Sequence, residues 1–165
     1  MKESVFQFLN QAQIPYEVTE HAAVFTMEGM SQLGLDPSGT VPKNLFLRDG
    51  KGRKHFLVTA ANDTQIDLKT LGEKIGAKKL SFASADRLAA YLGVTAGCVS
   101  PFGVLNDKEH AVTVILDSKL SSASKLGVHP NVNTATVWIS FQDLCHAIRL
   151  AGNELQIVDI NASFA

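Results

Sequence analysis

The stretch Asn44-Leu-Phe-Leu-Arg-Asp-Gly-Lys-Gly-Arg-Lys-His-Phe-Leu-Val-Thr59 has two apolar, β-favouring runs on either side of an Asp-Gly pair. The runs cover residues 44–48 and 54–59, and Asp49-Gly-Lys-Gly52 lies between them. Aspartate and glycine favour the tight turns that join antiparallel strands, so this arrangement is a strong local signal. The stretch therefore predicts a β-hairpin.

Helices are expected on both sides of this hairpin. Apolar residues repeat at helical spacing from Glu3 to Ala12, and Pro15 closes that segment. Three later segments begin with an aspartate or serine suited to N-capping and end at a glycine. These predicted helices cover residues 67–75, 84–92 and 141–150, and a further one is expected over 27–33.

Two β-branched runs predict further strands. Residues 111–116 should form a central strand, and residues 134–139 its later neighbour, both buried. Shorter strands are expected at 16–19 and 155–158. Strands and helices intermix without strict βαβ alternation, which predicts an α+β fold with a mixed, largely antiparallel sheet surrounded by helices. No repeat or linker divides the chain, so residues 1–165 are expected to form a single domain.

The composition is that of a globular protein. With 165 residues and 45% hydrophobic content, the chain can bury a core. Cys98 and Cys145 lie far apart and lack the spacing of a zinc site, so we expect neither a disulfide framework nor a metal site. The start of the chain does not have the apolar stretch of a signal peptide, and no apolar run approaches the ~20 residues that span a bilayer. A cytoplasmic protein without membrane contact is expected.

The charge pattern limits how the chain could bind nucleic acid. A net charge of −1 argues against binding driven by bulk electrostatics. Two local basic groups remain, one between Lys43 and Lys54 and one formed by Lys74, Lys78 and Lys79. Either could contact phosphate, but taken alone each is more typical of a solvated turn or helix end.

Common catalytic motifs are absent from the sequence. Gly50-Lys-Gly52 lacks the glycine spacing and the following Ser or Thr of a phosphate-binding loop, and there is no G-x-G-x-x-G, G-x-S-x-G or H-E-x-x-H. No close pair of carboxylates lies in an apolar setting. The usual nucleophilic and metal-dependent chemistries are therefore disfavoured.

Three polar segments beside apolar strands could carry chemistry. Lys43 precedes the first hairpin strand, where its ammonium could meet a phosphate or an ester carbonyl. The loop from Gly97 to Gly103 combines glycine and proline, which suits backbone N–H groups aimed at an oxyanion. The segment from His129 to Thr134 brings a titratable ring and two amides together. A solvated lysine, an ordinary connection and turn chemistry are the respective alternatives.

Together these segments resemble the YbaK/ProX superfamily of aminoacyl-tRNA deacylases, which are relatives of the editing domain of bacterial prolyl-tRNA synthetases. The resemblance spans nearly the whole chain and is closest to the ProX/PrdX alanyl-tRNA(Pro) deacylases. It rests on Lys43-Asn-Leu-Phe-Leu-Arg-Asp49, Gln65-Ile-Asp-Leu-Lys69, Leu80-Ser-Phe82, Gly97-x-x-x-Pro101-Phe-Gly103 with Leu105-Asn-Asp107, and His129-Pro-Asn-Val-Asn-Thr-Ala-Thr136.

The resemblance implies hydrolysis of the ester that joins an amino acid to the terminal adenosine of tRNA, with no metal or organic cofactor. Lys43 would be the functional lysine. The loop of Gly97, Ser100 and Pro101 would position the ester and stabilise its oxyanion through backbone amides. The ribose 2′-hydroxyl of the substrate is a hypothetical proton acceptor for the attacking water. Substrate-binding residues would be Asn44, His129 and Asn133, with Val24, Phe25, Met27 and Leu45 as the apolar walls.

The substrate implied is mischarged Ala-tRNA(Pro), with prolyl-tRNA synthetase as a possible partner. Cysteinyl- or seryl-tRNA is an alternative, because a small pocket separates such side chains poorly. A non-catalytic module that binds tRNA or a synthetase is another. Residues 117–127 are more polar and serine-rich than this resemblance leads us to expect, so we expect the loop that borders the pocket to differ in length or contacts.

Overall fold

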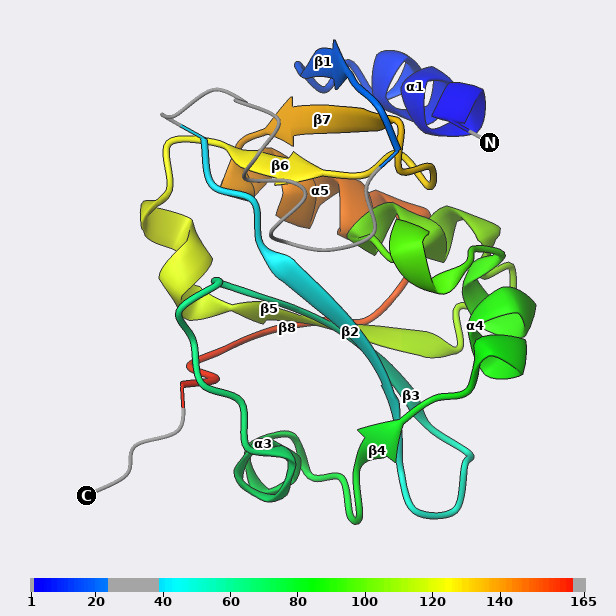
Figure 1. The fold of residues 1–165 in the computed structure, drawn as a ribbon, viewed down its shortest axis with the longest axis vertical. Coiled ribbons are helices and arrows are strands. Elements are labelled where there is room, and N and C mark those ends of the chain that lie inside the picture. Colours follow the sequence, from blue (N-terminus) through cyan, green and yellow to red (C-terminus); the bar gives the residue numbers. More distant parts are fainter. Residues whose placement is uncertain (1, 24–38, 162–165) are drawn as a thin grey trace.

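The computed structural model describes residues 2–23 and 39–161 (Figure 1). Its α-helices are α1 (Lys2–Gln11), α3 (Leu68–Ile75), α4 (Ala85–Leu92) and α5 (Phe141–Ala151), and its short 3₁₀ helices are η1 (Ala96–Cys98), η2 (Pro101–Asn106) and η3 (Ser118–Ser122). Its strands are β1 (Glu17–Glu20), β2 (Lys43–Arg48), β3 (His55–Ala60), β4 (Ser81–Phe82), β5 (Val112–Asp117), β6 (Leu126–Val128), β7 (Ala135–Ile139) and β8 (Leu155–Val158).

The strands form two sheets. The larger has the order β4-β2-β3-β5-β8, in which β2 is antiparallel to both neighbours while the β3–β5 and β5–β8 pairs are parallel. The smaller sheet, β1-β7-β6, is entirely antiparallel. The expected α+β class with mixed, largely antiparallel pairing is confirmed.

One expectation about strand neighbours is wrong. The strand at 134–139 was expected beside the strand at 111–116, yet β7 and β5 belong to different sheets. Both edges of β5 are already paired, with β3 and β8, and β7 lies between β1 and β6. Both strands are buried as expected. Because both strands are buried, both sequences are apolar and rich in β-branched residues. Such a sequence does not tell which sheet a buried strand joins.

The predicted hairpin and helix ends are confirmed. In the hairpin, β2 and β3 pair from Lys43 opposite Ala60 to Arg48 opposite His55. The side chains of Asp67, Ser84 and Ser140 accept hydrogen bonds from backbone N–H groups three residues on, and Gly76, Gly93 and Gly152 end the same helices in the left-handed conformation. The helix expected at 27–33 lies outside the described residues.

Two strands were missed by the sequence reading. β4 and β6 have only two and three residues, which is too short to show an alternating pattern. β6 begins at the end of the serine-rich segment, after η3, and supplies an edge of the smaller sheet.

Two hydrophobic clusters cover the two faces of the larger sheet. Helix α3 lies on one face, and the smaller sheet with α1, α4 and α5 lies on the other (Figure 1). Successive strand residues point to opposite faces, so Phe46, Leu57 and Val114 join the cluster beneath the smaller sheet, and Leu47, Val58 and Ile115 join the cluster beneath α3. Every residue of β3 is buried. Among the residues that the structure describes, no helix has the length and apolarity to cross a membrane.

Candidate active site

Lys43 lies at the open end of the β2–β3 hairpin, where β2 begins and β3 ends. Its ammonium group donates hydrogen bonds to the main-chain carbonyl oxygens of Thr64, at 2.6 Å, and Asn62, at 3.4 Å. Within residues 2–23 and 39–161, no carboxylate forms an ion pair with it. The lysine is therefore oriented by carbonyl dipoles and not neutralised, and a third N–H group remains for a ligand.

The next residues of β2 point to alternate faces of the sheet. The side-chain oxygen of Asn44 accepts a hydrogen bond of 2.7 Å from the hydroxyl of Thr59, its partner across the hairpin. Leu45 is half-buried and packs against the cluster beneath α3. Asn44 thus shares the face of Phe46, which packs in the same cluster as Phe102.

The predicted oxyanion loop spans η1 and the start of η2. Gly97 lies within η1, and Pro101 is the first residue of η2. Ser100 is fully buried, and its hydroxyl oxygen accepts a hydrogen bond of 3.1 Å from the backbone N–H of Phe102. Its side chain therefore caps η2, while Pro101 fixes the backbone that follows.

Asn131 joins this loop to the histidine segment. Its side-chain amide donates to the carbonyl oxygen of Phe102 at 3.1 Å, and its backbone has a positive φ of 64°. The residue is 4% exposed, and its side-chain oxygen has no hydrogen-bond partner among the described residues. Asn133, two residues on, is also buried. The sequence reading named Asn133 but not Asn131 as a site residue, although both stand in the same motif.

His129 is half-buried and directly follows β6 of the smaller sheet. Its Nδ1 lies 3.1 Å from the carbonyl oxygen of Ala135, which can only accept, so in the neutral ring Nδ1 carries the hydrogen and Nε2 is the basic nitrogen. Burial lowers the pKa of His129, opposed by that hydrogen bond and assisted by nearby His21. The two rings are 6.3 Å apart. Its surroundings therefore favour the neutral form of the ring.

His21 and Thr136 were missed by the sequence reading. Nε2 of His21 lies 2.8 Å from the hydroxyl oxygen of Thr136, and Nδ1 lies 2.8 Å from the carbonyl oxygen of Ala22. In a neutral ring that carbonyl fixes the hydrogen on Nδ1, and Nε2 then accepts from the hydroxyl. Thr136 is the last residue of the His129–Thr136 motif, and that motif could have identified it as a site residue. No sequence motif includes His21.

The segment that leads into β2 lies against the segment that leads to His129. The backbone N–H of Thr40 donates a hydrogen bond of 2.9 Å to the carbonyl oxygen of Lys125. The carbonyl oxygen of Thr40 accepts one of 2.8 Å from the backbone N–H of Gly127. A Cβ atom at Gly39 or Gly127 would lie within 3 Å of the Trp138 ring, so only glycine permits this close approach. Hydrogen bonds thus join the segment before β2 to the segment before His129, and Asn131 joins the histidine segment to the oxyanion loop. Val24, Phe25 and Met27 lie outside the described residues.

No group of three or more His, Cys, Asp and Glu side chains in the described ranges is arranged to hold a metal ion. The polar groups that these segments carry are a lysine, histidines, amides and backbone N–H groups. Such groups can bind and polarise an ester and stabilise an oxyanion.

Comparison with known proteins identifies the family. A sequence model of the aminoacyl-tRNA editing domain matches residues 21–146, which include every site segment described above. The chain belongs to the aminoacyl-tRNA editing domain family.

Relatives match this editing-domain chain along nearly its whole length. It is 47% identical to the prolyl-tRNA editing protein ProX of Acetoanaerobium sticklandii, over 96% of this chain and 97% of the relative. It is 32% identical to the prolyl-tRNA synthetase associated domain-containing protein 1 of Mus musculus, over 98% and 97%. The fold matches a crystal structure described as a candidate trans-editing enzyme for prolyl-tRNA synthetase, with a TM-score of 0.74, 19% identity, and coverage of 98% of this chain and 97% of that one.

The far end of β2 in this editing domain carries a cluster of basic residues. Its backbone is fixed because Asp49 accepts hydrogen bonds from the N–H groups of Arg53 and Lys54, and Gly50 donates its N–H to the carbonyl of Lys78. We define the hairpin-tip cluster as the cations of this turn and those that contact it: Arg48, Lys51, Arg53, Lys54, Lys78, Lys79 and Arg87.

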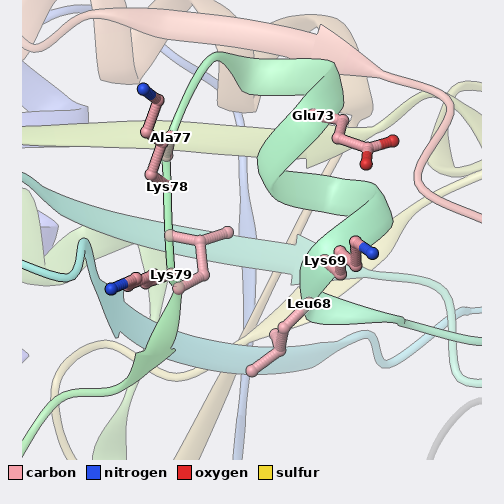
Figure 2. Close-up of a pocket in the computed structure, with 7 residues that line it drawn as sticks. Leu68, Lys69, Glu73, Ala77, Lys78 and Lys79 are labelled. Atoms are coloured by element: carbon pink, nitrogen blue, oxygen red, sulfur yellow. The ribbon is translucent and has the colours of Figure 1, made fainter.

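The hairpin-tip cluster borders two adjoining surface grooves. One, of about 430 Å³, is lined by Lys51, Lys54, Lys78 and Lys79, and the other, of about 390 Å³, lies between α3 and the segment before β4. Figure 2 shows the ammonium groups of Lys78 and Lys79 on the side away from the Glu73 carboxylate. Across the described ranges, no ion pair neutralises any cation of the cluster. Lysines from both of the basic groups that are separate in sequence meet here, while Lys43 and Lys74 lie elsewhere.

Proposed function

We propose that this protein is a trans-editing deacylase that hydrolyses the ester of mischarged Ala-tRNA(Pro). The observation that carries the proposal is 47% identity to a prolyl-tRNA editing protein across almost the full length of both chains. The site supports it, because it offers oriented hydrogen-bond donors without a strong nucleophile, and an activated ester needs only a positioned water and a stabilised oxyanion.

In the proposed reaction, water attacks the ester carbonyl carbon and the carbonyl oxygen becomes an oxyanion. Backbone N–H groups of the Gly97–Pro101 loop stabilise that oxyanion, and Lys43 holds the substrate with the N–H group left by its two carbonyl partners. The bond to the ribose 3′-oxygen then breaks. The ribose 2′-hydroxyl takes the proton of water as it passes its own to the leaving 3′-oxygen, so the amino acid leaves as a carboxylic acid that ionises.

The preference for alanine over proline is proposed to be steric. One methylene contributes only about 1–3 kcal/mol by attraction, so the larger ring must be excluded by pocket size. Val24, Phe25, Met27 and Leu45 are the proposed walls, with Asn44, His129 and Asn133 near the amino group. Seryl- and cysteinyl-tRNA are the competing substrates, since their side chains are close to alanine in size.

The hairpin-tip cluster is proposed to contact the tRNA backbone. Its cations, which form no ion pair in the part of the chain that the structure describes, suit phosphate contacts, which position a nucleic acid without reading its sequence. The whole chain is proposed to act as one editing unit in the cytoplasm, either alone or together with prolyl-tRNA synthetase. The names of the relatives suggest that synthetase as a partner.

The test is hydrolysis of alanyl-, seryl-, cysteinyl- and prolyl-tRNA by the purified protein, without added metal. We expect fast loss of alanine from the proline tRNA, sparing of prolyl-tRNA, and no activity in Lys43→Ala. A matched control is Lys74→Ala, because Lys74 also donates to a main-chain carbonyl, that of Asp159, but on α3. Absence of hydrolysis of every substrate would overturn the proposal and leave a binding module.

Full-rate hydrolysis of a substrate with a 2′-deoxy terminal adenosine would exclude the proton route through the ribose. We expect instead a large loss of rate, with binding of the tRNA unchanged.

A further inference from the structure

The ammonium group of Lys43 is positioned by main-chain carbonyls and therefore by whatever fixes those carbonyls. They belong to residues 61–64, the turn that follows β3. Such a turn is free to move unless its backbone is tied down, because each ordered residue loses conformational entropy. The contacts that immobilise this turn therefore decide where the lysine lies.

A buried aspartate from the neighbouring strand ties this turn down. Asp117 ends β5, which runs parallel to β3, so the C-terminal ends of the two strands lie side by side. Its Oδ2 accepts a hydrogen bond of 3.1 Å from the backbone N–H of Ala61 and one of 2.5 Å from the hydroxyl of Thr64. Asp117 is 0% exposed and Thr64 1% exposed.

The two carboxylate oxygens of Asp117 have separate tasks. Oδ1 accepts the backbone N–H of Lys119 and so caps η3. That contact alone would account for an aspartate at this position. Oδ2 does not contribute to the cap, and both of its partners lie in the turn that holds Lys43. The arrangement of Oδ2 is therefore unexplained by helix capping.

We propose that Asp117, acting through Thr64, is a positioning residue that holds the ammonium of Lys43 where the ester is hydrolysed. The hydroxyl of Thr64 is fixed by the carboxylate, and the carbonyl of the same residue receives the lysine at 2.6 Å. Neither Asp117 nor Thr64 touches the substrate. The importance of Lys43 for hydrolysis rests on the proposed function, whereas the positioning of Lys43 does not.

The test compares Thr64→Val with Thr64→Ser. Valine keeps the shape of threonine but lacks the hydroxyl, and serine keeps the hydroxyl, while the carbonyl that binds Lys43 remains in both. A misplacement of about 1 Å can cost about 100-fold in rate, so we expect kcat of Thr64→Val to fall about 10- to 100-fold with KM within about twofold. Thr64→Ser should restore kcat to near the unaltered protein.

Thr70→Val is the matched control. The hydroxyl of Thr70 also donates to a carboxylate at 2.5 Å, that of Asp67, but this pair caps α3 and does not contact Lys43. We expect Thr70→Val to lower stability without lowering kcat. An equal fall of kcat in Thr70→Val and Thr64→Val would overturn the proposal, because it would show a general effect of losing such a bond.

A second measurement follows the lysine without requiring hydrolysis. Trace acetylation by acetic anhydride, read by peptide mass spectrometry, gives the reactivity of Lys43 relative to Lys51. We expect that ratio to rise several-fold in Thr64→Val and to stay unchanged in Thr64→Ser and Thr70→Val. An unchanged ratio in Thr64→Val would overturn the proposal, as would a raised ratio with kcat intact. If the unaltered protein hydrolyses no tRNA, the proposed function fails, and the acetylation ratio still decides whether Thr64 positions Lys43.

Discussion

The two ends of β2 carry positive charge in different ways. At its first residue, Lys43 is held by two carbonyls of a turn that the buried Asp117 anchors. About five residues on, roughly 17 Å at 3.4 Å per residue, the hairpin-tip cluster has cations without ion-pair partners in the described part of the chain. A fixed charge suits contact with one small group, and a diffuse cluster suits contact with a phosphate backbone. If the proposed function holds, the same strand carries the chemistry at one end and the electrostatic attraction of tRNA at the other.

The largest effect is expected from removing the anchor at the Lys43 end. Asp117→Ala leaves the N–H of Ala61 and the hydroxyl of Thr64 buried without an acceptor. An unsatisfied buried group costs about 1–3 kcal/mol, so the free energy of unfolding should fall by about 2–6 kcal/mol. Denaturant unfolding measures this. Asp63→Asn, which alters an exposed pair with Lys119, is the control and should change unfolding little.

Lys43→Arg tests whether position or charge matters at this end. The guanidinium keeps the charge but has a planar fork that cannot replace the ammonium between two carbonyls. We expect kcat for Ala-tRNA(Pro) to fall about 100-fold, comparable to the loss of a single oxyanion donor. Lys78→Arg, at the other end, should leave kcat and affinity unchanged. Similar behaviour of the two variants would remove the distinction between the ends.

Neutralising two lysines of the hairpin tip should weaken binding without affecting chemistry. In Lys78→Ala combined with Lys79→Ala, the slope of log affinity against log salt should become shallower by about 1.4–1.8, which is 0.7–0.9 for each lost phosphate contact. Fluorescence titration of tRNA at several salt concentrations measures the slope. The exposed Lys108, beyond η2, gives the control variant Lys108→Ala. A slope that does not change would mean that the cluster is solvated surface.

The smallest effect concerns pH and His55, which supports the hairpin tip. His55 is buried, its ring lies 4.0 Å from that of Tyr91, and its Nε2 lies 3.0 Å from a guanidinium nitrogen of Arg87. Burial and the Arg87 charge lower the pKa of His55 below its ordinary value of 6.5. The unfolded chain therefore binds more protons just below pH 6.5, and stability falls as the pH decreases from 6.5 to the folded-state pKa.

Replacing His55 should reduce this pH dependence. The pKa of His129 is lowered in the same direction, so part of the slope should persist in His55→Phe. Unfolding free energies between pH 7 and 5 measure both slopes. An unchanged slope in His55→Phe would show that other groups account for the loss.

Local signals in the sequence predicted much of the fold, and tertiary packing decided the rest of the site. The hairpin and the three capped helices depend on residues close together in the chain, such as Asp49 in the turn and Ser140 at the start of α5. Lys43 was recognised because it stands in a motif. Thr64 and Asp117 were not, because their contact joins residues 53 positions apart across two parallel strands.

The sequence by itself therefore determined the α+β class, the hairpin, the helix ends and membership of an editing family. Turn residues, caps and apolar periodicity act over a few positions, and those effects can be seen in one dimension. Only the tertiary structure decided that β5 and β7 lie in different sheets, that lysines from two separate groups meet at one hairpin tip, and that a buried aspartate fixes the turn which holds Lys43. Those features depend on which strands pair, and pairing is settled by how both faces of the sheet are buried.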